Sequence, residues 1–176
     1  HINKYENAYN NVGIFGNFKF HEKIIFMNNL FNAFKVENSK KLIIKKNIIL
    51  GGYDSKKFSK KIKEDKYLKN KFTIEGEFDK LTNFLSKIDS IIIPMLQTSG
   101  IKIKLFECIA TCKPTMINEE VKEHLPREFV EYFPSLFFFS EIKVEALNDF
   151  YLYCDHYYLN ELWKVNLKNI YRINWH

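Results

Sequence analysis

The segment from Ser99 to Glu107 combines residue types that can bind an anion. Lys102 and Lys104 lie at the expected start of a helix, directly after Gly100, and Glu107 follows about one turn later. A helix N-terminus already carries partial positive charge, so each cation there costs about 0.3–1 kcal/mol unless an anion lies nearby. The spacing therefore predicts that this segment holds a negatively charged ligand.

The polar groups of this segment suit two parts of one ligand. Ser99 fits the N-cap position, and Gly100 allows a ligand to approach the backbone closely. The two lysines would add positive charge beside a diphosphate. The carboxylate of Glu107 has two acceptor oxygens, which can hold both hydroxyls of a ribose. A diphosphate together with a ribose indicates a nucleotide.

A solvated helix start is the alternative explanation of the same residues. Only Arg127 and Arg172 of the 27 basic residues are arginines, which leaves 25 lysines, so two lysines in a short segment are unremarkable. A glutamate on a helix is usually solvated. The sequence also contains neither a Gly-x-Gly-x-x-Gly pattern nor a Walker-type Gly-Lys-Ser/Thr pattern. These residues alone leave both explanations open.

Short apolar runs alternate with segments of helical period along the chain, a pattern typical of parallel α/β units. The expected strands are 12–15, 47–50, 72–74, 90–93, 115–117 and 136–139. The expected helices cover 24–34, a segment from about 55, 79–87, 100–111, and the chain from 141 onward. We therefore predict a doubly wound, Rossmann-like parallel sheet of about six strands with helices on both faces.

Ligands of such a sheet bind beyond the carboxyl ends of its strands, where the strand order reverses. The turns at Gly16 and Gly76 and the loop before Gly100 all lie at expected strand ends. These three turns are the candidate binding loops.

Five segments, taken in order, resemble the C-terminal donor-binding domain of GT-B glycosyltransferases of the group 1, or family 4, type. They are VGIFGN (12–17), IILGG (48–52), FTIEGEF (72–78), IDSIIIPM (88–95) and SGIKIKLFECIATCKPT (99–115). The last segment is quite specific, whereas the others are generic alone. The resemblance covers roughly residues 12–117.

The resemblance implies roles for individual residues. Glu107 takes the place of the second glutamate of the family's pair and would hold the ribose, whereas Ser99 stands where the first glutamate usually lies. Lys102 and Lys104, with the backbone of Gly100 and Ile101, would lie near the diphosphate. The first loop that faces the cleft would contain Gly16, Asn17 and Lys19, with Lys23 as an alternative to Lys19. The turn 75–78, which includes Glu77, would lie where the base of the nucleotide binds.

The resemblance also implies an activity. Such a domain belongs to a retaining, metal-independent hexosyltransferase that moves a sugar from a UDP-, GDP- or ADP-linked donor to a glycan, lipid or protein, as in polysaccharide biosynthesis. The chain is expected to be a piece of a longer protein, with a linker at 1–11, a donor-binding domain at 12–176 and an N-terminal acceptor domain that is not included. It should bind donor without turnover. We predict no catalytic residue, cofactor or metal site in this part.

Two other functions fit the same fold. The first is a Rossmann-like nucleotide-binding or regulatory module without transferase activity. The second is half of a nucleotide-sugar epimerase, which would need acid and base residues that the sequence does not indicate.

The charge pattern bears on partners and location. The net charge is +6, but the scarcity of arginine argues against nucleic acid as a partner.

A dense lysine run at 56–71 surrounds Phe58 and Ile62, an apolar pair expected in the core. The run is either a solvated face or a site of attraction to an anionic membrane. No apolar run reaches the roughly 20 residues of a membrane span. We expect a soluble, cytoplasmic protein, with contact at the inner face of the cell membrane left open.

The remaining reactive side chains are expected to be structural. Cys108 and Cys112 lie one turn apart on the same expected helix, where buried thiols in a reducing compartment are the simplest interpretation. His21 and His124 are isolated and are expected at the surface. An aromatic group (Phe150, Tyr151, Tyr153, Tyr157, Tyr158 and Trp163) should pack on the sheet, with an exposed interdomain patch as the alternative.

Overall fold

A computed structural model describes residues 10–39, 46–95 and 102–172. It contains one sheet of six parallel strands in the order β3-β2-β1-β4-β5-β6. The predicted doubly wound Rossmann-like sheet is therefore confirmed. The strands are β1 (Asn11–Phe15), β2 (Asn47–Gly51), β3 (Phe72–Gly76), β4 (Ser90–Ile92), β5 (Thr115–Asn118) and β6 (Leu136–Phe139).

The strand order reverses between β1 and β4. The chain first adds β2 and β3 on one side of β1, then returns to place β4 on its other side. Val12 of β1 pairs with Ile48 of β2 and with Ser90 of β4. The carboxyl ends of β1 and β4 are consequently neighbours, and the switch point lies between them.

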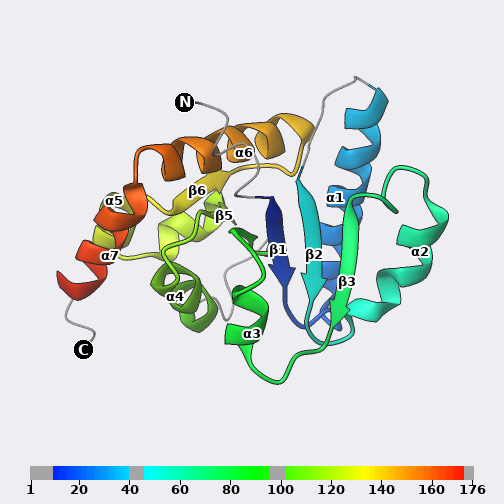
Figure 1. Cartoon of the computed structure of the whole chain (residues 1–176), viewed down its shortest axis with the longest axis horizontal. Coiled ribbons are helices and arrows are strands. Elements are labelled where there is room, and N and C mark those ends of the chain that lie inside the picture. The colour runs from blue at the N-terminus through cyan, green and yellow to red at the C-terminus, as the bar shows by residue number, and fades with distance from the viewer. Residues whose placement is uncertain (1–9, 40–45, 96–101, 173–176) are drawn as a thin grey trace.

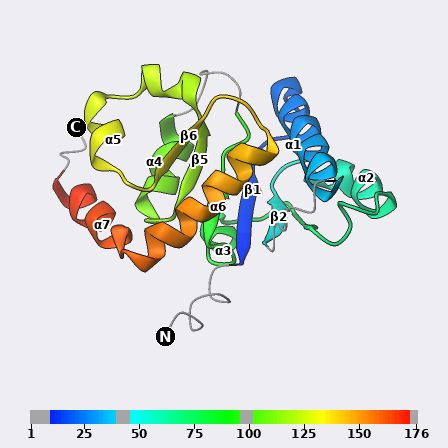
Figure 2. The same cartoon turned by 90° about the horizontal axis from the view of Figure 1, so that it is seen from above.

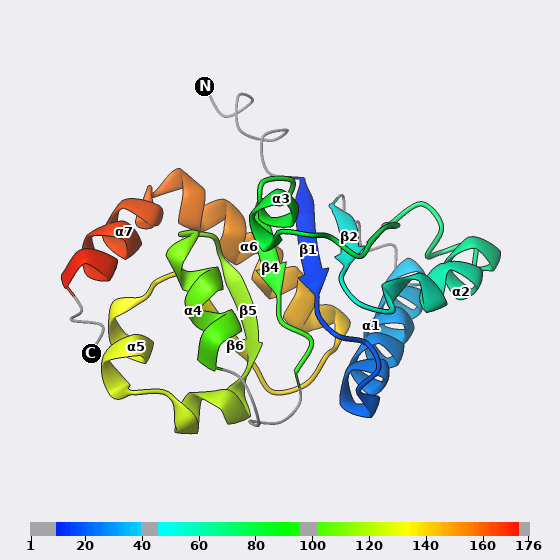
Figure 3. The same ribbon diagram turned by 90° about the horizontal axis from the view of Figure 1, so that it is seen from below.

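Helices cover both faces of the sheet, as Figures 2 and 3 show from opposite sides. One face packs against α1 (His21–Ser39), α2 (Ser59–Glu64) and α6 (Val144–Leu159), with Phe31 and Phe150 among its buried residues. The other face packs against α3 (Leu81–Leu85), α4 (Lys102–Ala110), α5 (Arg127–Tyr132) and α7 (Leu162–Arg172). Two 3₁₀ helices, η2 (Ser55–Phe58) and η3 (Glu119–His124), complete the described elements.

The central strands of the sheet are buried on both faces. The central strands read as continuous apolar runs because helices cover both of their sides. Ile91 and Ile92 of β4 are fully buried, and Phe58 and Ile62 lie in the core as expected. The expected aromatic packing is confirmed in part: Phe150, Tyr151 and Tyr157 of α6 are buried and Tyr153 and Tyr158 are half-buried, whereas Trp163 is exposed on α7.

Several boundaries differ from the sequence-based expectation. Asn11, placed at the end of the linker, is the first residue of β1. Helix α4 ends at Ala110, and Cys112 adopts a left-handed backbone with φ of 55°. The prediction that Cys112 is a buried thiol on the helix of Cys108 was therefore wrong, because Cys112 lies beyond the helix and is only half-buried.

The C-terminal part of the chain was also divided differently. Glu161 has φ of 53° and separates α6 from α7, where a single helical region was expected. Helix α5 and η3, between β5 and β6, were not predicted. Within the described ranges, no helix is both long enough and apolar enough to cross a bilayer.

Candidate functional site

The carboxyl ends of β1, β2 and β3 are joined backbone to backbone. The Gly16 N–H donates to the Gly51 carbonyl at 3.3 Å, and the Gly52 N–H donates to the Gly76 carbonyl at 2.7 Å. Gly52 has φ of 106°, and a Cβ atom there would lie 2.3 Å from the Gly16 oxygen. Only glycine fits at Gly52. These contacts hold the loops after the three strands in fixed relative positions.

Two loops meet at Lys19 on this edge. The Phe18 N–H donates to the Tyr53 carbonyl at 3.0 Å, and the Lys19 N–H donates to Oδ1 of Asn17 at 3.1 Å. The Lys19 ammonium lies 4.7 Å from the centre of the Tyr53 ring. The Tyr53 side chain is the main cause that raises the pKa of Lys19, and the carboxylates of Asp54 and Glu77 act in the same direction. The structure thus brings Lys19 and Glu77 into one neighbourhood.

A second group of positive charge lies at the switch point itself. A Cβ atom added at Gly16 would lie 3.5 Å from Cδ of Lys23 and 3.6 Å from Cγ of Pro94, so α1 and the end of β4 both border Gly16. Burial lowers the pKa of Lys23, and the positive charge of Lys104 on α4 lowers it further, against a smaller opposite effect of Glu22.

Neither lysine at the switch point has an ion-pair partner within the described ranges. Two lysines from helices that are far apart in the sequence therefore repel each other where the strand order reverses. Holding Lys23 there costs free energy, because its ammonium is partly removed from water and lies close to a second positive charge. A bound diphosphate would supply the missing negative charge.

Some of the other predicted site residues are described by the structure, and others lie outside the described ranges. Glu107 is exposed on α4, one turn after Lys104. Ser99, Gly100 and Ile101 lie outside the described residues, and so does the side chain of Lys102, whose backbone begins α4. Glu75 of β3 forms an ion pair with Lys87, and in the turn after β3 the Phe78 ring stacks on Phe84 with 5.0 Å between ring centres.

Sequence analysis missed two residues of this edge. Tyr53 and Asp54 follow β2 and contact Lys19 or its neighbours, and Asp54 also binds Lys57 with its carboxylate at 2.9 Å. Lys57 additionally donates to the Phe18 carbonyl. The signal that could have found them is the Gly51-Gly52 pair directly before, because adjacent glycines at a strand end indicate a close approach of loops.

The described residues contain no group of three or more His, Cys, Asp or Glu side chains that could hold a metal ion. The three cysteines are free thiols, and burial raises the pKa of Cys108 to about 12. His21 and His124 are both exposed.

Comparison with known proteins supports the fold. No family model and no curated protein matches this sequence. The structure of TarM is similar, with a TM-score of 0.63 and 14% identity over 91% of this chain and 31% of that chain. The structure of HepE from Anabaena in complex with UDP is similar as well, with a TM-score of 0.62 and 12% identity over 92% of this chain and 43% of that chain.

Both similar structures are glycosyltransferases, and this chain shares a Rossmann-like α/β fold with part of each. At these identities the likeness concerns the fold alone. The chain spans less than half the length of either protein. The chemistry of the intact protein is therefore a matter of proposal.

Proposed function

We propose that this chain is the donor-binding domain of a retaining, metal-independent glycosyltransferase that uses a nucleotide-diphosphate sugar. The observation that carries the proposal is the proximity of Lys104 to Lys23 at the switch point, where the positive charge of Lys104 helps to lower the pKa of Lys23. The fold is shared with two glycosyltransferases, one of which was crystallised with UDP. Two unpaired cations at the usual ligand position of this fold are suited to a diphosphate.

The proposed binding mode assigns one part of the ligand to each loop. Lys23 and Lys104 hold the diphosphate from two sides, with Lys102 and the backbone of Gly100 and Ile101 completing that part. Glu107 accepts hydrogen bonds from the ribose hydroxyls. The loops at Gly16, Asn17 and Lys19 and at Glu77 border the rest of the donor.

In this proposal the domain assists the reaction through the leaving group. Negative charge develops on the nucleoside diphosphate as the bond to the sugar breaks, and fixed cations stabilise that charge. The acceptor, a glycan, lipid or protein, would bind to the remainder of the intact protein. The side chain of Ser99 offers no carboxylate toward the donor sugar.

Calorimetric titration of the folded chain with UDP, GDP, ADP and their sugar conjugates tests the binding proposal. We expect one nucleotide family to bind, with the same affinity in EDTA and in Mg²⁺. Absence of binding at millimolar ligand by a sample that melts cooperatively would reject the proposal.

A matched pair of variants tests the ribose assignment. Glu107→Ala should weaken nucleoside diphosphate binding by about 1–3 kcal/mol, because charged hydrogen bonds are lost. Glu128→Ala removes another exposed glutamate, on α5, and should bind like the wild type. Equal affinities of both variants would exclude Glu107 as the ribose ligand.

Turnover by the intact protein separates the alternatives. A transferase releases free nucleoside diphosphate in an acceptor-dependent manner and keeps the anomeric configuration of the sugar, which NMR of the product shows. An epimerase converts the donor without an acceptor, and a regulatory module does neither.

A further inference from the structure

The positive charge of the chain is concentrated in one segment. Residues 56–71 contain eight lysines and two acidic residues, Glu64 and Asp65, whereas the whole chain has 27 basic and 21 acidic residues. The rest of the chain therefore has 19 of each, and the entire formal net charge of +6 belongs to this segment. A lysine-rich composition alone would spread the excess. The lysine cluster consists of Lys56, Lys57, Lys60, Lys61, Lys63, Lys66, Lys69 and Lys71.

The lysine cluster lies along η2, α2 and the following turn, and Figure 1 shows α2 at the edge of the molecule beyond β3. Phe58 and Ile62 are the buried residues that anchor these two helices beside Ser55. Lys60, Lys63, Lys66 and Lys69 are exposed and have no acidic partner within the described ranges. Their charges are available to an external partner.

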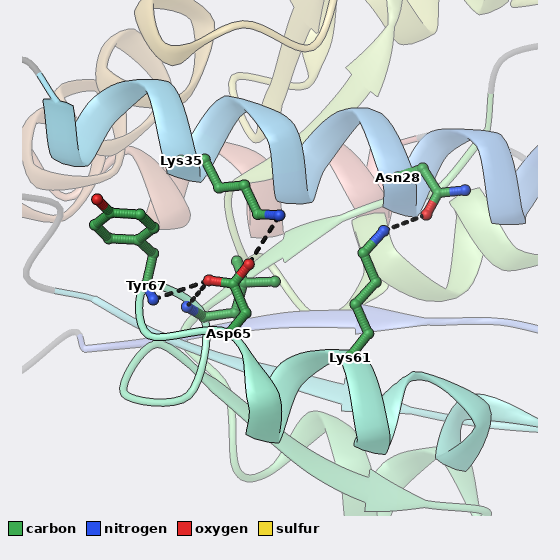
Figure 4. A network of polar contacts seen from close by, with 6 residues as sticks. Asn28, Lys35, Lys61, Asp65 and Tyr67 are labelled. Atoms are coloured by element: carbon green, nitrogen blue, oxygen red, sulfur yellow. Dashed lines mark hydrogen bonds and ion pairs between the residues drawn. The ribbon is translucent and has the colours of Figure 1, made fainter.

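The acidic residues of the segment do not neutralise these four lysines. Asp65 accepts from Lys35 of α1 at 2.8 Å and from the Tyr67 N–H at 2.9 Å, so its charge faces inward (Figure 4). Lys61 is also directed to α1, where it donates to Oδ1 of Asn28 at 2.7 Å. Only Glu64 remains exposed among the free lysines.

We propose that the lysine cluster docks this chain on an anionic lipid bilayer. Lysine is a hydrated point charge, which suits the diffuse negative charge of lipid headgroups. The segment contains no arginine for bidentate recognition. Its one aromatic residue besides the buried Phe58 is Tyr67, which is half-buried, with the Lys66 ammonium 4.7 Å from its ring centre. These features favour a lipid surface over nucleic acid.

The docking is electrostatic without insertion of apolar side chains. An amphipathic helix that enters a membrane must present its apolar side to lipid, but Phe58 of η2 and Ile62 of α2 are buried in the protein core. Binding should therefore be reversible by salt. This inference does not use the proposed nucleotide site and stands or fails separately from it.

Sedimentation with lipid vesicles tests the inference. The vesicles contain phosphatidylcholine, with or without about one-third phosphatidylglycerol, at physiological salt, where each lysine near the surface contributes about fivefold to partitioning. The triple variant Lys60→Gln, Lys63→Gln and Lys69→Gln should lose about 100-fold in partitioning to the anionic vesicles. Wild type should not bind neutral vesicles, and raised salt should release it.

A control variant separates docking from net charge. Lys80→Gln, Lys122→Gln and Lys168→Gln removes three exposed lysines outside the cluster and should lose less than about fivefold. Equal losses in the two triple variants would overturn the proposal. So would unaltered vesicle binding in the cluster variant, or binding to single-stranded or duplex nucleic acid in place of vesicles. Thermal melting should be the same for all three proteins, which excludes unfolding as the cause.

Discussion

Near each end of helix α1, one of its lysines lies close to a lysine of another helix. The two places differ in the groups that surround the lysines. Near its start, Lys23 lies close to Lys104 of α4; near its end, Lys35 lies close to Lys61 of α2. In each place burial lowers the pKa of one lysine, and the second lysine lowers it further.

The two places differ in whether the positive charges of the lysines have partners within the protein. At the α2 end, Asp65 binds Lys35 and Asn28 binds Lys61, so both cations have partners within the protein (Figure 4). At the α4 end, neither lysine has an ion pair within the described ranges. The first arrangement stabilises the fold. The second leaves repulsion that an anionic ligand would relieve, and this contrast separates a structural lysine pair, Lys35 and Lys61, from the proposed binding pair, Lys23 and Lys104.

The strongest way to break the comparison is to remove both lysines of the proposed binding pair. In the variant Lys23→Met with Lys104→Met, affinity for the nucleoside diphosphate should fall at least about 100-fold, since each charged hydrogen bond contributes about 1.5–3 kcal/mol. Stability should stay equal or rise, because the repulsion is gone. Calorimetry and thermal melting measure the two effects, with Lys80→Met and Lys122→Met as the control. Unchanged affinity would show that the pair is no ligand site.

A change at the structural lysine pair, Lys35 and Lys61, should affect the stability of the fold and not ligand binding. Asp65→Ala removes the partner of Lys35 and the acceptor of the Tyr67 and Leu68 N–H groups, so the free energy of unfolding should fall by about 1–3 kcal/mol. Nucleotide affinity should not change. Urea titration measures the loss, and Asp65→Asn, which keeps an acceptor oxygen, should lose less. A variant as stable as wild type would contradict the assigned role.

The ion pair between Lys35 and Asp65 makes the stability of the protein depend on pH in a defined way. The hydrogen bond from Lys35 is the main cause that lowers the pKa of Asp65 below its usual 3.8. A lowered pKa in the folded state stabilises the protein above pH 3.8, and this contribution is lost as the pH falls through the folded-state pKa. The stability difference between wild type and Asp65→Asn should therefore be constant near neutral pH and vanish under acidic conditions. A difference that persists at the lowest pH would indicate another cause.

The smallest expected effect is the titration of Lys23. Its pKa in the free protein should lie below the usual 10.5, because of burial first and Lys104 second. Its own charge therefore destabilises the fold, and stability from this group should rise with pH between the folded-state pKa and 10.5. A bound diphosphate should raise the pKa, and Lys104→Met should raise it partly. NMR of the lysine side chains measures both shifts, and a pKa that does not respond to the nucleotide would place the ligand elsewhere.

Much of the fold could be predicted because it depends on local pattern. The strands at 47–51 and 136–139 are short apolar runs between breaking residues, and they were found nearly to the residue. The failures are backbone events with weak sequence signals. Cys112 and Glu161 adopt left-handed conformations that end one helix and divide another, although neither residue is a glycine.

The candidate site shows the same division. The sequence indicated the strand-end loops and named Lys19, Lys23 and Lys104, but it could not decide which lysines meet. The structure places Lys23 near Lys104 and places Lys19 against Tyr53.

The sequence by itself thus determined the order of the elements, the α/β class and the residue types at each strand end, because these follow from neighbouring residues. Only the tertiary structure decided that α1 and α4 bring Lys23 and Lys104 together. That meeting depends on β1 pairing with β4 across a long stretch of chain, and the cost of burying the Lys23 charge depends on every atom that replaces water around it.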